Sequence, residues 1–154
     1  MADINRKTFY RYYISPDDIM KEIVDCTISR IFGNDFGKID FEKLFQNPEI
    51  IFQQLNELME EDFQTYEILF KIKGPENLLQ KIQILLKEKL IAFFLEKSIS
   101  DTTDIMIFCE FCSAGIIGAY RYWFCSSQKI PLEELSQKVC DMIKSCMETL
   151  SIKI

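Results

Sequence analysis

Residues 105–124 have the sequence IMIFCEFCSAGIIGAYRYWF, which is apolar around the whole circumference of a helix. Glu110 is the only charged residue in the segment before Arg121. A helix with no polar face must be buried on every side, either in a protein core or in a membrane. The segment therefore predicts a helix that its own chain, a partner or a bilayer must enclose.

A membrane span is one way to bury such a helix, and the sequence argues against it. The uninterrupted apolar run is shorter than the ~20 residues that a span needs, and Glu110 lies inside it. No other segment of the chain is suited to insert beside it. We therefore expect no membrane partner.

Small residues in the middle of the segment favour a second copy of the chain as the partner. Glycine within a helix costs about 0.5–1 kcal/mol relative to alanine, so Gly115 and Gly118 indicate close packing that offsets this cost. Two helices from each copy would form a four-helix interface; the alternative is a core helix of a monomer. The expected dimer interface consists of Ser113, Ala114, Gly115, Ile117, Gly118, Tyr122, Leu135, Val139 and Met142.

The rest of the chain is typical of an all-α protein. Its 154 residues include five glycines and four prolines, too few for a turn-rich β protein. With 48% hydrophobic and 13% aromatic residues it is not disordered, and its length suits one domain, or one and a fragment of another. Apolar spacing and capping residues predict helices at about 16–32, 41–46, 48–60, 75–97, 105–124 and 131–150, with one more carrying Phe63 to Phe70.

Charge limits how the chain could meet DNA. The net charge is −6, yet the first 13 residues carry Arg6, Lys7 and Arg11 against the single acid Asp3. An acidic body repels nucleic acid, so any DNA contact would come from the short basic start.

Histidine and cysteine content argue against an enzyme or a metalloprotein. The chain has no histidine, which excludes histidine-based triads and removes the commonest zinc ligand. Its six cysteines lie in apolar stretches without a secretion signal, which indicates free thiols in the cytoplasm. Cys109 and Cys112 lack a second pair at zinc-like spacing, so they are interpreted as buried small residues. Cys140 and Cys146 are expected in the core or interface, with thiol sensing left open. No cofactor is expected.

Residues 2–13, with the sequence ADINRKTFYRYY, combine a small residue, an aliphatic, a polar cap, Thr-Phe-Tyr and an aromatic three residues further on. This pattern resembles the end of the helix-turn-helix of TetR-type transcriptional regulators. The resemblance implies a recognition helix at about 5–11; a local hydrophobic staple unrelated to DNA is the alternative. In the family, these positions contact bases or the DNA backbone. The implied DNA-binding residues are Arg6, Lys7, Thr8, Tyr10 and Tyr12.

Residues 112–123, with the sequence CSAGIIGAYRYW, resemble the penultimate helix of many TetR-type C-terminal domains. The helix opened by Ser15 and Pro16 is similar to the family's linker helix. The resemblance implies an all-α helical bundle of the TetR C-terminal type with a remnant of the helix-turn-helix. The implied domains are residues 1–14 as a partial DNA-binding domain, 15–32 as the linker helix, and 33–154 as the ligand-binding and dimerisation domain.

In the family, a first helix and a positioning helix precede the recognition helix. By the resemblance Met1 therefore falls inside the helix-turn-helix, and we expect either a chain truncated at its N-terminus or a start codon assigned too far downstream. Many members also carry a lysine near the start of the linker helix, where Asp17 and Asp18 stand here and would repel DNA. We therefore expect this chain to bind DNA weakly or without sequence specificity.

The resemblance also implies a small-molecule pocket inside the helical domain. It would be apolar, with Tyr66 or Glu110 orienting a small apolar or aromatic effector; plain core is the alternative. The function implied is a cytoplasmic one-component regulator, a repressor, that binds operator DNA as a homodimer when full length. The alternative is a helical homodimeric module that has lost DNA binding. The expected pocket residues are Phe52, Phe63, Tyr66, Phe70, Phe94, Phe108 and Phe111.

Overall fold

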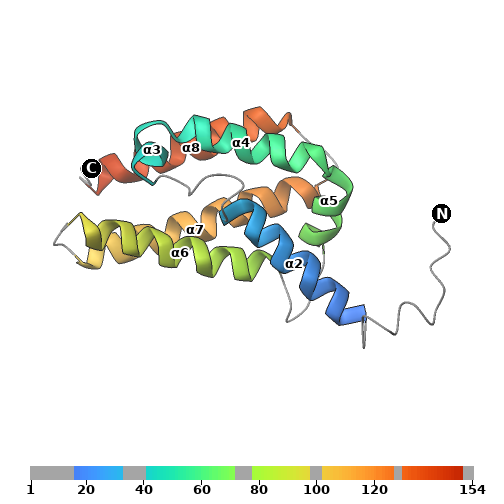
Figure 1. Cartoon of the computed structure of the whole chain (residues 1–154). Helices are drawn as coiled ribbons and strands as arrows, with labels where there is room; N and C mark the ends of the chain where they lie inside the picture. Colours follow the sequence, from blue (N-terminus) through green and yellow to red (C-terminus); the bar gives the residue numbers. More distant parts are fainter. Residues whose placement is uncertain (1–15, 33–40, 72–77, 98–101, 127–129, 151–154) are drawn as a thin grey trace, which may run out of the picture. The chain divides into compact units, whose positions relative to one another are not determined.

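A computed structural model describes residues 16–32, 41–71, 78–97, 102–126 and 130–150. Every regular element in these residues is an α-helix, which confirms the predicted all-α class. The chain divides into two compact units, residues 1–38 and 39–154, and we treat each by itself. Figure 1 shows the helices, which are α2 (Pro16–Phe32), α3 (Phe41–Gln46), α4 (Pro48–Glu61), α5 (Phe63–Lys71), α6 (Leu78–Glu96), α7 (Thr102–Cys125) and α8 (Leu132–Thr149).

Proline marks the start of three of these helices, and Pro16 is the first residue of α2. Pro48 occupies the first turn of α4, where its missing N–H would have had no partner. Pro131 was expected to be the first residue of the last helix, but it occupies the N-cap and α8 begins at Leu132. Glu133 and Glu134 follow in the first turn, where carboxylates interact favourably with the helix dipole. The predicted boundaries of α4 and α8 thus hold to within one residue.

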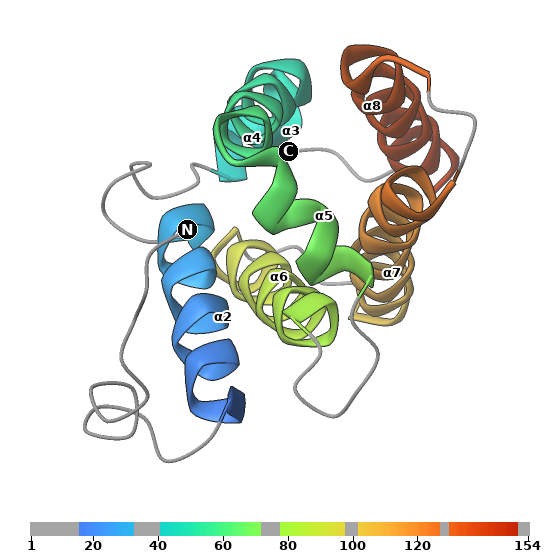
Figure 2. The ribbon, with the colours of Figure 1, turned by 90° about the vertical axis from the view of Figure 1, so that its right-hand side faces the viewer.

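The second unit is built around α7, which contacts α5, α6 and α8. Helix α4 packs against α3, α5 and α8. Figures 1 and 2 show α6 and α7 side by side in one layer and α4 and α8 in the other. Helix α5 lies between the two layers and contacts helices of both. Because α7 touches three other helices, it supplies residues to most of the core.

Aromatic side chains dominate that core and form two clusters. In the first, Phe94 and Phe108 meet edge to face with ring centroids 5.7 Å apart, and Phe45 of α3 lies 6.0 Å from Phe108. In the second, Phe70 and Phe124 stack at 4.3 Å. Such pairs contribute about 0.5–1.5 kcal/mol beyond the burial of their area. The clusters therefore hold α3 and α5 against α6 and α7.

A chain of buried hydrogen bonds crosses from α7 through α4 to α8. The Tyr120 hydroxyl donates to Asn56 Oδ1 at 3.1 Å, and Asn56 Nδ2 donates to Ser136 Oγ at 2.9 Å. Ser136 in turn donates to the backbone carbonyl of Glu133 at 2.9 Å. Burial raises the pKa of Tyr120, so its hydroxyl stays protonated and remains a donor at neutral pH. These bonds fix the positions of three helices in the second unit relative to one another.

Candidate interaction surface

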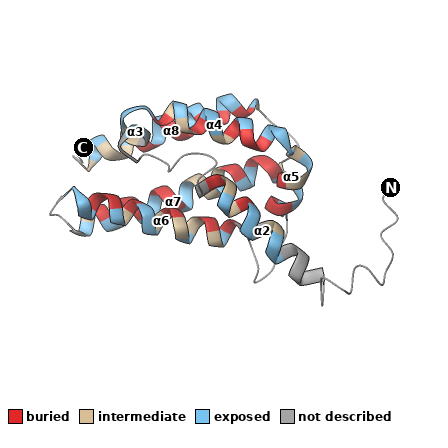
Figure 3. Ribbon diagram, in the orientation of Figure 1, coloured by how far each residue is buried: buried red, intermediate tan, exposed pale blue. Residues whose placement is uncertain are grey.

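Helix α7 has one face buried by its neighbours and one face that they leave exposed, as Figure 3 shows along the second unit. Phe108, Cys109 and Ser113 are fully buried, whereas Phe111 is 62% and Tyr122 73% exposed. The chain therefore encloses only one side of the helix that the sequence predicted must be buried all round. The exposed side defines a stripe of residues at helical spacing, which we call the α7 stripe: Ile107, Phe111, Ala114, Gly115, Gly118 and Tyr122.

The two glycines of the α7 stripe have no structural role inside the protomer. A Cβ atom added at Gly115 or at Gly118 would meet nothing within 4 Å, so either position has room for a larger residue. Each glycine nevertheless costs the helix about 0.5–1 kcal/mol relative to alanine. No contact among the described residues offsets that cost. A close approach by another molecule at these two positions would offset it.

The expected interface residues divide into two groups. Ala114, Gly115, Gly118, Tyr122 and Met142 are exposed, and Ile117 is partly exposed. Ser113, Leu135 and Val139 are buried inside the protomer, and Ser113 Oγ donates to the backbone carbonyl of Glu110 at 3.1 Å. We therefore leave these three out of the surface proposed below. Periodicity showed that α8 has an apolar side, but it could not show that α4 and α7 already cover most of it.

Two residues that sequence reasoning did not assign to the surface extend it. Ile107 is 55% exposed on the α7 stripe, and Phe111, which was assigned to the pocket, lies on the same stripe. Ile107, Phe111 and Gly115 follow one another at intervals of four residues. This spacing was the signal that could have placed the first two on the stripe.

A shallow groove separates the first half of α7 from the second half of α8. Its volume is about 760 Å³. Its lining is mainly apolar and includes Met142 at 65% exposure, with the polar residues Lys138, Asp141 and Ser145 also contributing. Ion pairing within α8 already holds Lys138, whose Nζ lies 3.2 Å from Glu134 Oε1. The residues lining the groove are Ile107, Phe111, Lys138, Asp141, Met142, Ser145, Cys146, Thr149 and Leu150.

Two opposite charges flank the α7 stripe on its α6 side. Glu110 is exposed and its Oε2 lies 3.0 Å from Lys87 Nζ of α6. Arg121, three turns along the same edge, is exposed and forms no ion pair with any residue that the structure describes. The stripe thus has an acidic end and a basic end.

Helix α7 is long and apolar enough to cross a membrane, and it is the only such helix in the described residues. Its neighbours do not suit a bilayer. Helix α8 packs beside it and exposes charged residues along its length, including Glu133, Asp141 and Lys144. A charged helix in direct contact with α7 would have to enter the lipid with it, which is costly.

The seven residues expected to line an effector pocket do not meet in one place. Five are buried, but in different surroundings: Phe94 and Phe108 belong to the first aromatic cluster and Phe70 to the second, while Phe52 stacks on Tyr120 at 6.3 Å and Tyr66 lies on α5. Phe63 is partly exposed at the edge of the second cluster, 6.0 Å from Trp123. Phe111 is exposed on the opposite side of α7, so it cannot share a pocket inside the protomer with the others. Helical periodicity could not separate the two sides, because α7 is apolar on both.

A second hollow, of about 390 Å³, lies between α4 and α8. It is polar and acidic, with Glu49, Glu57, Glu60 and Glu133 among its lining residues. Lys144 of α8 donates a hydrogen bond to Glu49 and thereby lowers the pKa of that carboxyl. An apolar effector would find few suitable contacts here.

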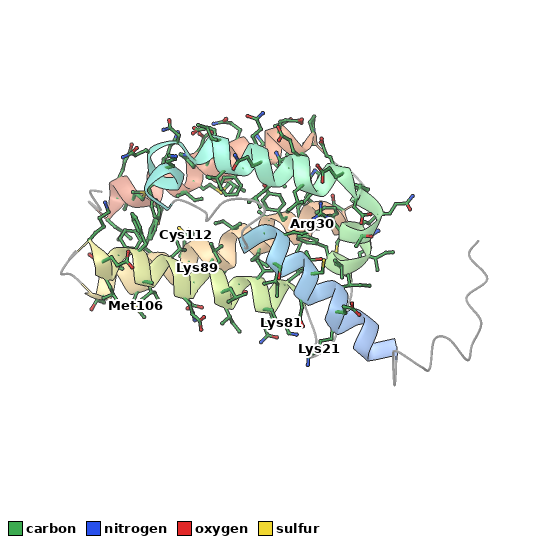
Figure 4. The ribbon with its side chains drawn as sticks, viewed as in Figure 1. Lys21, Arg30, Lys81, Lys89, Met106 and Cys112 are labelled. Carbon is green, nitrogen blue, oxygen red and sulfur yellow. The ribbon has the colours of Figure 1, made fainter. Side chains whose placement is uncertain are left out.

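The cysteines near the α7–α8 contact are poor nucleophiles. Burial raises the pKa of Cys109 to about 11 and that of Cys112 to about 12, and the Cys112 thiol also lies beside Cys146 of α8. Figure 4 labels Cys112 between α7 and the layer of α4 and α8. Cys140 is likewise buried, with its pKa raised to about 11. These thiols stay protonated at neutral pH, so their environment favours a packing role. No group of three or more metal-ligating side chains occurs among the described residues.

The expected DNA-binding residues Arg6, Lys7, Thr8, Tyr10 and Tyr12 lie outside the described residues. The helix after them, α2, is present over Pro16–Phe32 as the sequence predicted. Figure 4 labels Lys21 and Arg30 on it.

Comparison with known proteins gives one match. Residues 46–145 match the model of a TetR-type family described as a transcriptional regulator C-terminal region. No curated protein and no solved structure matches the chain. The matched region extends from α4 to near the end of α8, so it contains the α7 stripe, most of the residues that line the groove, and both aromatic clusters except Phe45.

Proposed function

Because the chain belongs to the TetR-type transcriptional regulators, we propose that it is a one-component repressor that acts as a homodimer in the cytoplasm and responds to a small molecule. The observation that carries the dimer is the α7 stripe with the neighbouring groove, an apolar surface that lies mostly inside the family-matched region. A stable dimer buries about 800 Å² per partner with an apolar centre and a polar rim, and this surface has that composition. Two protomers joined here would carry two DNA-reading segments.

DNA binding is proposed for the basic start of the chain, with Arg6 and Lys7 contacting bases or phosphates and Thr8, Tyr10 and Tyr12 contacting the backbone. The acids Asp17 and Asp18 and the acidic body oppose this contact and weaken it. Because the attraction comes from basic side chains at phosphates, the affinity should fall as salt rises. Effector binding would act by favouring one arrangement of the helical unit and so changing the separation of the two DNA-reading segments.

DNA recognition is tested by letting the protein select sequences from a pool of randomised double-stranded DNA. Because this chain is expected to bind DNA weakly, we expect at most a low level of enrichment at about 50 mM salt and its loss near 200 mM. The enriched sequence should be an inverted repeat with half-sites about 34–36 Å, or a multiple of this, apart, because a two-fold dimer presents its two heads symmetrically. The variant Arg6→Ala should lose the enrichment, whereas Lys71→Ala on α5 should keep it. If no sequence is enriched even at low salt, the alternative of a dimeric interaction module without DNA binding is favoured.

Effector binding is tested by thermal unfolding with small aromatic or lipophilic compounds. A compound at about 100 times its Kd stabilises the folded state by about 2.7 kcal/mol, which corresponds to a rise in Tm of about 5 °C or more for a chain of this size. A ligand inside the protomer should lose its effect in Phe63→Ala, at the edge of the second cluster, and keep it in Phe111→Ala. The reverse pattern would place the ligand in the surface groove. A panel that produces no shift would count against effector binding.

A further inference from the structure

The small and large residues of the α7 stripe are arranged symmetrically about its centre, so the stripe can pack against a second copy of itself. Its two glycines lie at the centre, Phe111 lies four residues before Gly115, and Tyr122 lies four residues after Gly118. Phe111 and Tyr122 are eleven residues apart, close to three full turns, so they point in nearly the same direction. A two-fold axis passing between Gly115 and Gly118 would therefore place each Tyr122 opposite the partner's Phe111.

The groove provides space for that tyrosine. It lies beside Phe111 in the first half of α7, where the two-fold axis would direct the second half of the partner's α7. Its mainly apolar lining, with Lys138, Asp141 and Ser145 as polar members, suits a side chain that combines an aromatic ring with a hydroxyl group. Tyr122 is 73% exposed, more than any other large apolar or aromatic side chain described, so the protomer leaves most of its ring without contacts.

The charges beside the stripe agree with the same axis. Glu110 and Arg121 are also eleven residues apart and share the α6 edge of the stripe. An antiparallel two-fold pairing keeps each edge on the same side, so Glu110 would face the partner's Arg121 with an offset of two residues, about 3 Å along the axis. Long side chains span this offset easily. In a parallel two-fold pairing the two α6 edges would lie on opposite sides of the interface, so Glu110 and Arg121 would not face each other across it.

From these three observations we infer that two copies of this chain meet with their α7 helices antiparallel, crossing at Gly115 and Gly118. In this register Tyr122 enters the groove beside the partner's Phe111, and Glu110 pairs with the partner's Arg121. The inference rests on the proposed homodimer and adds its register, its contact residues and its charge pairing. The glycines permit the close approach, the aromatic residues supply the buried area, and the charges pair only in the antiparallel arrangement.

Charge reversal measured by sedimentation equilibrium tests the register. Arg121→Glu should raise the dimer Kd by ~10-fold or more, because it sets two carboxylates against each other at two symmetric sites. Glu110→Lys should weaken the dimer in the same way. The double variant Glu110→Lys/Arg121→Glu restores opposite charges across the interface and should return the Kd to within ~3-fold of the wild-type value. Matched reversals on other exposed surfaces, Lys71→Glu on α5 and Glu88→Lys on α6, should leave the Kd unchanged.

The outcomes distinguish a wrong register from the absence of a dimer. A wild-type chain that stays monomeric at micromolar concentration, or that forms no dimer but binds lipid vesicles, overturns both. A wild-type dimer whose Kd ignores the single reversals, or is not recovered in the double variant, overturns the register and leaves the dimer standing. Recovery in the double variant supports the register, because a merely structural effect of either substitution would persist when the two are combined.

Discussion

Replacing Gly118 by leucine is expected to raise the dimer Kd by ~100-fold or more while the protomer keeps its fold. Inside one chain a side chain at this position meets nothing within 4 Å, and leucine favours helix over glycine by about 0.5–1 kcal/mol. At the crossing point of two α7 helices the added side chain would force the backbones apart. Overpacking costs about 1–3 kcal/mol at each of two symmetric sites, which corresponds to the expected change in Kd. Sedimentation equilibrium gives the Kd, and far-ultraviolet circular dichroism gives the helix content.

Two further variants make the effect of Gly118→Leu specific. Gly118→Ala adds a single methyl group and should weaken the dimer less than leucine does. Ala92→Leu places the same leucine side chain at an exposed position of α6, away from the α7 stripe, and should leave the dimer intact. The proposal of a glycine-centred interface fails if Gly118→Leu dimerises as tightly as the wild type, or if Ala92→Leu weakens the dimer equally.

Replacing Asn56 by alanine is expected to lower the free energy of unfolding by about 2–4 kcal/mol. Asn56 is 4% exposed and connects Tyr120 of α7 to Ser136 of α8. Its removal deletes two hydrogen bonds, leaves the Tyr120 hydroxyl buried without this acceptor, and creates a small void; each unsatisfied buried group costs about 1–3 kcal/mol. Urea unfolding followed by circular dichroism, at a fixed protein concentration, measures the change.

The neighbouring Gln53 provides the control for Asn56. Its Nε2 donates to Glu57 Oε1 at 3.1 Å on the exposed side of the same helix, so Gln53→Ala should cost less than about 0.5 kcal/mol. Adding Tyr120→Phe to Asn56→Ala should cost little more than Asn56→Ala alone, since the two residues share one hydrogen bond. A change below 1 kcal/mol for Asn56→Ala would show that the buried chain of hydrogen bonds does not stabilise the protomer.

The family match and the sequence resemblance agree on the helical domain, and both include the apolar helix α7. A helix apolar on both sides needs a covering on both, so the composition of residues 105–124 alone predicts either a core helix of a monomer or a helix that a partner covers. Because α7 is apolar on both sides, the sequence could not show which of its residues are buried in the protomer and which are exposed. Phe111 and Phe108 are both aromatic and three residues apart, yet one is exposed and the other fully buried.

The buried polar chain could not be anticipated at all. Asn56 lies between Leu55 and Glu57 in a helix with an ordinary apolar stripe, and nothing local distinguishes it from a solvent-exposed amide. Its partners are 64 and 80 residues away in the sequence. Only the packing of α4 on α8 and α7 brings them within hydrogen-bond distance.

The sequence by itself determined the all-α class, the helices and their approximate ends, because proline, capping residues and 3.6-residue periodicity act within one or two turns. It also determined that α7 needs a covering on two sides. The tertiary structure decided which side the protomer covers: α5, α6 and α8 bury Phe108, Cys109 and Ser113 and leave Phe111, Gly118 and Tyr122 exposed. Periodicity specifies that a helix has apolar residues around it, whereas only the position of neighbouring helices specifies which of them remain available to a partner.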